Sequence, residues 1–98
     1  MLTGKQIRFL RGLGHHLQPV VMVGKEEVSA QVVASVEEAL STHELIKIKL
    51  QEGCITPRKE VAEALAQTCA AEIAQVLGRT ILLYRSSDNK LIDLPKAK

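Results

Sequence analysis

Hydrophobic residues recur along this chain with two different periods, which predict seven elements of secondary structure. Apolar residues three or four positions apart are typical of helices, whereas short continuous or alternating apolar runs are typical of strands. Helices are predicted over residues 3–13, 29–40 and 56–69, and strands over residues 19–23, 44–50, 72–77 and 80–84. The predicted order is helix, strand, helix, strand, helix, strand, strand.

The first helix combines a capping signal with one apolar stripe. Thr3 and Gln6 fit a capping box, in which Thr3 caps the helix and Gln6 reaches back. The stripe expected to face the core is formed by Ile7, Leu10 and Leu13, with Phe9 beside them. Two glycines, Gly12 and Gly14, are expected to end this helix.

The next two strands differ in their patterns. Residues 20–23 are apolar throughout, which predicts an interior strand covered on at least part of both faces. Ser29 then caps the second helix, which has one apolar side. Within the strand predicted over residues 44–50, Ile46, Ile48 and Leu50 alternate with Lys47 and Lys49, so one face is expected to be core and the other basic and solvated.

Turn residues mark the remaining boundaries. Thr56 as N-cap, followed by Pro57 at the first helical position, predicts the start of the third helix. Gly78 and Arg79 fit a type II′ hairpin between the last two strands. The polar tail after Arg85 contains two apolar pairs that either add an edge strand or lie back on the core, Leu91-Ile92 and Leu94-Pro95.

These elements predict an α/β chain of the α+β two-layer type, with a four-stranded mixed sheet. The two strand–helix–strand units are expected to be right-handed crossovers that place their helices on one face of the sheet. The closing hairpin is antiparallel, which makes the sheet mixed. A chain of 98 residues fits one domain over residues 1–98, with residues 86–98 as a C-terminal extension.

Composition narrows the classes of function. No apolar run approaches the roughly 18 residues of a membrane span, and the N-terminus lacks the apolar core of a signal peptide. A cytosolic location is therefore expected. Two cysteines, Cys54 and Cys69, lack metal-ligand spacing, so we expect no metal and no cofactor. Since no spare apolar stripe is visible, a monomer is expected.

Charge is segregated along the chain although the formal net charge is only +2. Residues 1–25 contain basic residues and no acid, namely Lys5, Arg8, Arg11 and Lys25. Residues 26–44 contain acids and neither Lys nor Arg, namely Glu26, Glu27, Glu37, Glu38 and Glu44. Such segregation gives a polarised surface if the first segment shares one face, and otherwise indicates only solvated helices.

A strand, a glycine turn and a helix N-terminus follow one another around Gly24 and Lys25. Free backbone N–H groups and the helix dipole make such a place suitable for an anion. The alternative is a plain turn with a solvated lysine. If the turn contacts a nucleic-acid backbone, most naturally RNA, its candidate residues are Gly24 and Lys25. The second group of candidates consists of Lys5, Arg8, Arg11, Lys47 and Lys49.

No sequence motif requires an enzyme. The chain has no nucleophile elbow, Walker loop or dinucleotide fingerprint, so no catalytic residue is assigned. Besides histidine, the aromatic residues are Phe9 and Tyr84, too few for a sheet that stacks several bases. A nucleic-acid-binding chain of this kind is expected to contact phosphates and sugars and to read shape.

Several stretches together resemble a YhbY-type CRM domain (chloroplast RNA splicing and ribosome maturation), over about residues 3–95. They are residues 3–6 (TGKQ), 10–21 (LRGLGHHLQPVV), 43–49 (HELIKIK), 76–85 (VLGRTILLYR) and 94–95 (LP). Each stretch is loose alone, but their order within one short chain is specific.

The resemblance implies a non-enzymatic RNA-binding domain whose sheet and covering helices resemble the C-terminal domain of bacterial translation initiation factor three. Stand-alone bacterial members of this family associate with precursors of the large ribosomal subunit, while plant organellar relatives assist group II intron splicing. The expected partner is therefore precursor ribosomal RNA in large-subunit precursor particles. Neither a membrane nor a small-molecule substrate is expected.

The family's RNA-contact loop follows a G-x-x-G pattern, often with a basic residue inside. Gly24 and Lys25 match the first two positions, but the fourth is Glu27, preceded by Glu26. Two carboxylates repel phosphate, and a side chain replaces the second glycine. Either Lys25 and the free N–H groups suffice, or the main RNA footprint lies on the second group of basic residues.

A second hypothesis comes from another class of function. The acidic segment could make the chain a protein-interaction module that docks on a ribosomal protein or an assembly factor. The two hypotheses differ in which charges matter: the basic residues named above, or Glu37 and Glu38 together with Glu26 and Glu27.

Overall fold

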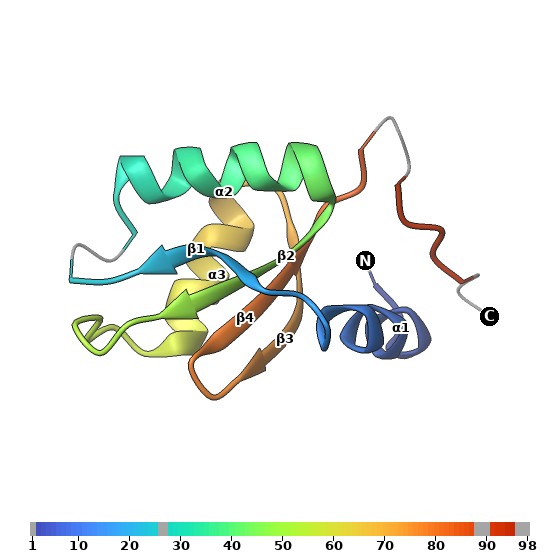
Figure 1. The fold of residues 1–98 in the computed structure, drawn as a ribbon, viewed down its shortest axis with the longest axis horizontal. Coiled ribbons are helices and arrows are strands. Elements are labelled where there is room, and N and C mark those ends of the chain that lie inside the picture. The colour runs from blue at the N-terminus through green and yellow to red at the C-terminus, as the bar shows by residue number, and fades with distance from the viewer. Residues whose placement is uncertain (1, 26–27, 88–90, 96–98) are drawn as a thin grey trace.

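The computed structural model describes residues 2–25, 28–87 and 91–95. Its elements follow the predicted order (Figure 1). They are α1 (Gly4–Gly14), β1 (Pro19–Val23), α2 (Ala30–His43), β2 (Leu45–Leu50), α3 (Arg58–Thr68), β3 (Glu72–Leu77) and β4 (Thr80–Tyr84). Glu26 and Glu27, which bear on the expected loop, lie outside the described residues.

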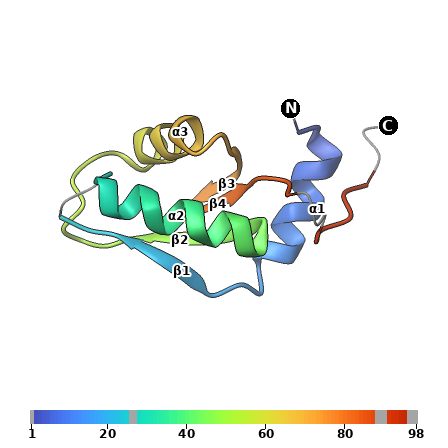
Figure 2. The same cartoon turned by 90° about the horizontal axis from the view of Figure 1, so that it is seen from above.

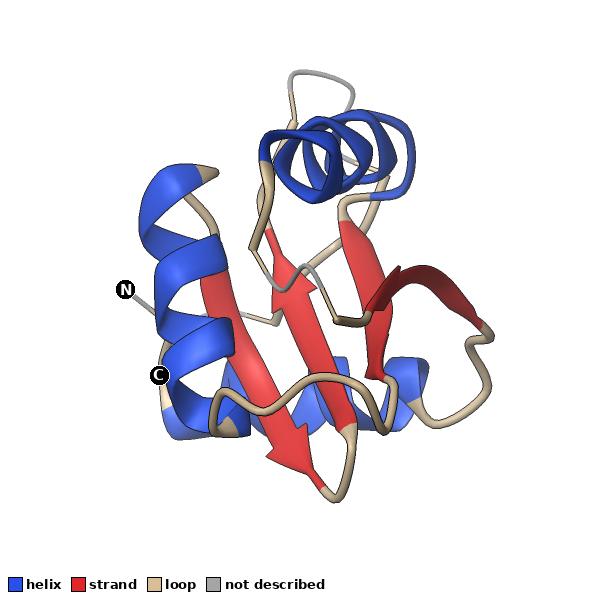
Figure 3. Cartoon of the chain, turned by 90° about the vertical axis from the view of Figure 1, so that its left-hand side faces the viewer, coloured by secondary structure: helices blue, strands red, loops and turns tan. Residues whose placement is uncertain are grey.

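The four strands form one mixed sheet, as the sequence predicts, and their order in the sheet, which the sequence did not predict, is β1-β2-β4-β3. β1 and β2 are parallel, and the other neighbouring pairs are antiparallel. Helices α2 and α3 lie together on one face of the sheet, which confirms the predicted placement (Figure 2). Helix α1 lies at one end of the opposite face (Figure 3). Much of that second face is therefore left uncovered.

The main core lies between the sheet and helices α2 and α3. β2 contributes Ile46 and Ile48, while α2 and α3 contribute the fully buried Leu40 and Leu65. Burial of one such side chain stabilises the fold by about 1.5–3 kcal/mol. Cys69 also lies in this core, where its side chain packs as a small apolar group. Burial raises the pKa of its thiol, and the nearby Glu37 carboxylate adds to the effect.

A smaller core lies between α1 and the other face of the sheet. The capping box of Thr3 and Gln6 forms as predicted. Only one member of the expected apolar stripe, Leu10, is fully buried. One turn later α1 approaches the sheet so closely that a Cβ on Gly14 would lie 2.4 Å from Cδ1 of Leu82. Helix and sheet therefore meet along the narrow line of Leu10 and Gly14.

The sequence pattern wrongly predicted that two further residues of α1, Leu13 and Phe9, face the core. Leu13 is 41% exposed and Phe9 is 39% exposed. Their exposure follows from the contact of α1 with only one end of the sheet. The 3.6-residue period shows that a helix has an apolar side, but it does not show how wide the covering surface is.

The prediction of β1 as an interior strand is also wrong. β1 is an edge strand, and while Val21 and Val23 are buried, Val20 is 52% exposed and Met22 is 49% exposed. The outward pair faces the uncovered side of the sheet. A uniformly apolar strand thus has one core face and one apolar face in contact with solvent.

Several element boundaries differ from the prediction by a few residues. Helix α2 continues to His43, so Glu44 is its C-cap with φ 63° rather than the first residue of a strand. Helix α3 begins at Arg58 with Pro57 as N-cap, in place of the expected Thr56. At the β3–β4 turn Gly78 has φ 58°, the positive value expected of the first residue of a type II′ turn.

The buried carboxylate of Glu44 fixes the C-terminal segment to the body of the protein. It accepts hydrogen bonds from the backbone N–H groups of Ser87 and Ile92, each at 2.8 Å, and from the Ser87 hydroxyl. Burial alone raises the pKa of this carboxyl, but the hydrogen bonds together outweigh it and hold the pKa below its usual value. Ile92 and Leu94 lie back on the smaller core, one of the two predicted alternatives.

Candidate nucleic-acid interface

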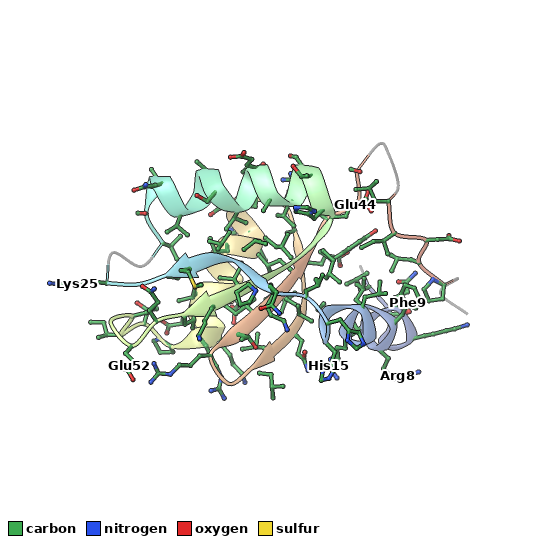
Figure 4. All side chains as sticks on the ribbon, viewed as in Figure 1. Arg8, Phe9, His15, Lys25, Glu44 and Glu52 are labelled. Carbon is green, nitrogen blue, oxygen red and sulfur yellow. The ribbon has the colours of Figure 1, made fainter. Side chains whose placement is uncertain are left out.

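The turn after β1 lies at one narrow end of the molecule. Lys25 is exposed there and points away from the body (Figure 4). The N–H of Gln51 donates to the carbonyl of Val23 at 2.8 Å, and a Cβ on Gly53 would lie 3.4 Å from the Lys25 nitrogen. The turn therefore rests against the neighbouring loop after β2, which holds the Lys25 backbone in place.

Helix α2 begins beside this turn as predicted. The Ser29 hydroxyl accepts a hydrogen bond from the N–H of Val32 at 3.2 Å, and the first turn of the helix contains no acidic residue. A hollow of about 360 Å³ with mixed polar and apolar lining lies between turn and helix, with Gly24, Lys25 and Ser29 among its lining residues. This arrangement suits an anion, since the helix N-terminus and Lys25 both favour negative charge.

Glycine at position 24 is not required by backbone conformation, since its φ is not positive. A Cβ at this position would lie 2.6 Å from Oε1 of Gln51, the far end of a flexible side chain that could move aside. The fold therefore depends only weakly on glycine at position 24.

Helix α1, at the other end of the molecule, carries three residues of the second group, Lys5, Arg8 and Arg11 (Figure 4). Lys5 and Arg8 are exposed. Arg11 is exposed as well, but its Nε donates to the carbonyl of Ala74 in β3 at 3.3 Å. Part of the Arg11 side chain thus helps to hold α1 on the sheet, so Lys5 and Arg8 are the better candidates for an external ligand.

Lys47 and Lys49 lie on the side of the sheet that carries α1. Side chains alternate along a strand, and Ile46 and Ile48 face the main core while Leu45 belongs to the smaller core under α1. Lys47 is half-buried and Lys49 is exposed. As predicted, β2 therefore has one apolar face and one basic face.

The predicted basic residues form a track rather than a single patch. Helix α1 and the two lysines of β2 share the side that α2 and α3 leave uncovered. Lys25 lies at the opposite end of the longest dimension from α1, in a molecule with extents of 40 × 25 × 22 Å. A ligand that contacts both ends must therefore be extended.

Two arginines that the sequence did not single out as ligand candidates extend the basic character of the Lys49 region. Lys49 pairs with Thr80 in the sheet, directly after Arg79. Arg58 donates from its guanidinium to the carbonyl of Gly78 at 3.3 Å, and both arginines line a hollow of about 190 Å³. One signal was visible: Arg58 stands in the first turn of a helix, where the dipole disfavours a cation. The position of Arg79 depends on strand order, which the local pattern does not give.

An apolar pocket of about 420 Å³ is the other feature that the sequence did not reveal. It lies where the end of α1, the start of β1, β2, the end of α2 and the C-terminal segment meet. Its apolar lining includes Leu13, Leu17, Val20, Leu45 and Ile92, and its polar lining consists of Gln18, His43 and Lys47. The exposed Leu13 and Val20 both line this pocket.

The acidic face of α2 is partly occupied by a structural contact. Glu37 forms an ion pair with Arg85 at 2.9 Å, and the same guanidinium donates to the carbonyl of Cys69 at 2.8 Å. Glu38 is exposed. The charge of Glu37 therefore contributes to the packing of α2 against the strand ends and is not simply a solvated surface charge.

The described part of the chain offers neither a cluster of metal ligands nor a membrane-spanning helix. Within residues 2–25, 28–87 and 91–95, no group of three His, Cys, Asp or Glu side chains could hold a metal ion. Across the same residues no helix has both the length and the apolar character to cross a membrane.

Comparison with known proteins identifies the group to which this chain is similar. It is 45% identical over 96 residues to "Probable RNA-binding protein YqeI" of Bacillus subtilis, covering 97% of this chain and 100% of that protein. It is 39% identical over 95 residues to a protein of Haemophilus influenzae named "RNA-binding protein", covering 97% of this chain and 96% of that protein.

A solved structure agrees in fold. The solution structure of hypothetical protein SAV1595 from Staphylococcus aureus has a TM-score of 0.83 and 38% identity, covering 97% of this chain and 100% of the other. The sequence model of the CRS1/YhbY (CRM) domain matches residues 2–85. That match covers all seven elements, from the capping box of α1 to the end of β4, and the chain therefore belongs to the CRS1/YhbY (CRM) domain family.

Proposed function

We propose that this protein binds RNA without catalysing a reaction, and that its RNA partner is precursor ribosomal RNA in large-subunit precursors, whose assembly it assists. The observation that carries the proposal is the basic track on the uncovered side of the sheet. Helix α1 at one end carries Lys5 and Arg8, β2 carries Lys47 and Lys49, and Lys25 stands at the other end.

Such an arrangement suits contacts with the RNA backbone. Exposed lysines and arginines bind phosphates and release counterions, which gives sequence-independent affinity. The hollow beside Gly24 and the N-terminus of α2 adds a place for one phosphate. An extended or structured RNA that follows the track can contact several of these groups at once, whereas a small anion contacts only one.

Two further points support RNA as the partner. The relatives from Bacillus subtilis and Haemophilus influenzae are named as RNA-binding proteins, the first as a probable one. The choice of large-subunit precursors rests on the resemblance to stand-alone bacterial members of the family. The competing idea of an acidic docking surface is weakened by the ion pair that engages Glu37 with Arg85.

The test is the salt dependence of binding to a structured fragment of precursor ribosomal RNA, measured by fluorescence anisotropy. Several phosphate contacts predict a steep linear fall of log affinity with log salt, and each charge removed should reduce the slope by about one. Lys47→Ala and Arg8→Ala should each do so. Lys59→Ala removes an exposed charge from α3, on the other side of the sheet, and should leave the slope unchanged.

Binding that is almost independent of salt would contradict the proposal. So would equal slopes for the wild type and for a variant that combines Arg8→Ala with Lys47→Ala. Lys49→Ala provides a third, independent substitution on the same strand face, so a folding defect in one variant would not obscure the result.

A further inference from the structure

Backbone binding alone leaves the apolar pocket at the end of α1 unused. It has about 420 Å³ of space, within the range of pockets that bind small molecules. Leu13 and Val20 at its walls are 41% and 52% exposed, so they leave apolar surface in contact with water. A ligand with an apolar surface would remove that contact.

The chemistry of the lining is selective. Among the described residues that line the pocket none is acidic, whereas Lys47 places a positive charge in it. Gln18 supplies an amide and His43 an imidazole, so hydrogen-bond donors and acceptors are both available. The pocket therefore combines apolar walls, a few polar groups and a charge that attracts an anion.

The position of the pocket links it to the basic track. Lys47 belongs both to the pocket and to the basic face of β2, and Leu13 belongs to the helix that carries Lys5 and Arg8. An RNA strand that follows the track passes the mouth of the pocket with its phosphates near Lys47. The bases of unpaired RNA can be splayed out of the strand, and single-stranded regions are where proteins usually read RNA sequence.

We propose that this pocket receives one unstacked nucleobase of the bound RNA. The flat faces of the base lie against the leucine side chains, Gln18 and His43 contact its polar edge, and Lys47 contacts the adjacent phosphate. This inference rests on the proposed RNA binding and adds to it a site for a single base. It differs from stacking on an aromatic sheet, because aliphatic side chains and one imidazole form the walls.

The test compares RNAs of equal charge that differ only in their bases. Single-stranded homopolymers of adenine, cytosine, guanine and uracil nucleotides are compared with an abasic oligoribonucleotide of the same length, using the full chain. At least one of the four should bind at least about 5-fold more tightly than the abasic form. That factor corresponds to the lower end of the free energy that one stacked base contributes. The preferred base identifies which polar edge the pocket accepts.

Variants then assign that preference to the pocket. Gln18→Ala combined with His43→Ala should reduce the preference to less than about 2-fold, because the polar contacts are lost while every charge of the track remains. Gln67→Ala on α3 is the control, since Gln67 is exposed on the far side of the sheet and should leave the preference unchanged. Photocrosslinking with a 4-thiouridine-containing RNA should label residues 13–20 or 43–47.

Each contrary result has a distinct meaning. Equal affinity for abasic and intact RNA, with a steep salt slope retained, overturns the base pocket and leaves backbone binding standing. A preference that persists in the double variant, with crosslinks only outside these two segments, also overturns the pocket. Failure of every RNA to bind overturns the pocket and the proposed function together. If an apolar peptide occupied the pocket in place of a base, the pocket would be assigned to a protein partner and the inference would be overturned.

Discussion

Replacement of Glu44 by glutamine should destabilise the protein substantially. The carboxylate is fully buried and accepts hydrogen bonds from Ser87 and Ile92. A hydrogen bond to a charged group contributes about 1.5–3 kcal/mol, and a buried group left unsatisfied costs about 1–3 kcal/mol. Glutamine keeps one acceptor and turns an amide donor toward the donors of the C-terminal segment. We therefore expect Glu44→Gln to lower the free energy of unfolding by about 2–4 kcal/mol.

The pH dependence of this loss has a definite sign. The pKa of Glu44 in the folded protein is lowered, because the hydrogen bonds outweigh the effect of burial. A lowered pKa stabilises the fold at pH values above the unfolded-state pKa of about 4.3 and ceases to do so as the pH falls through the folded-state value. The difference between wild type and Glu44→Gln should therefore be largest near neutral pH and shrink below about pH 4.

Urea denaturation followed by circular dichroism at several pH values measures both quantities. Glu38→Gln is the matched control, because Glu38 is exposed on the same helix and the change should alter stability by less than about 0.5 kcal/mol. A Glu44→Gln protein as stable as wild type at pH 7 would refute the assigned role of the carboxylate. A difference that grows on acidification would refute the sign of the pKa shift.

Three other substitutions test separate parts of the structure. Gly14→Ala should lower the free energy of unfolding by about 1–3 kcal/mol, because the new Cβ would clash with Leu82. In Gly12→Ala the new Cβ meets nothing within 4 Å, so this variant should be neutral or stabilising. Thermal unfolding of both variants compares the two effects. Ser29→Ala removes an N-cap and should lower the same free energy by about 1 kcal/mol. An unchanged free energy of unfolding would contradict the capping role of Ser29. Arg79→Ala should reduce the salt slope of RNA binding by about one with little change in melting temperature, and an unchanged slope would remove Arg79 from the track.

The sequence predicted the elements well because each is marked by local chemistry. The capping box at Thr3, the alternation along residues 44–50 and the glycine at position 78 act within a few residues of one another. The order of elements then implied a mixed sheet with α2 and α3 on one face. The errors, such as the interior position expected of β1, concern what covers an apolar surface, which depends on residues far away in the sequence.

The candidate site was predictable to a smaller extent. Lys47 and Lys49 were assigned correctly to a solvated strand face, because a period of two fixes the side on which each residue lies. Arg79 and the pocket beside Leu13 depend on strand order and on the placement of α1, which no short pattern encodes. The buried role of Glu44 was missed for the same reason, since its partners lie more than 40 residues along the chain.

Sedimentation of cell lysate through a sucrose gradient, at low and raised salt, tests the proposed function most directly. Wild-type protein should co-migrate with large-subunit precursors at low salt and be released at raised salt, because phosphate contacts are screened. A variant combining Arg8→Ala, Lys47→Ala and Lys49→Ala should remain at the top of the gradient, while Lys59→Ala should behave as wild type. The proposal would be contradicted if wild-type protein stayed at the top at low salt, or if Glu38→Lys abolished co-migration while the triple variant retained it.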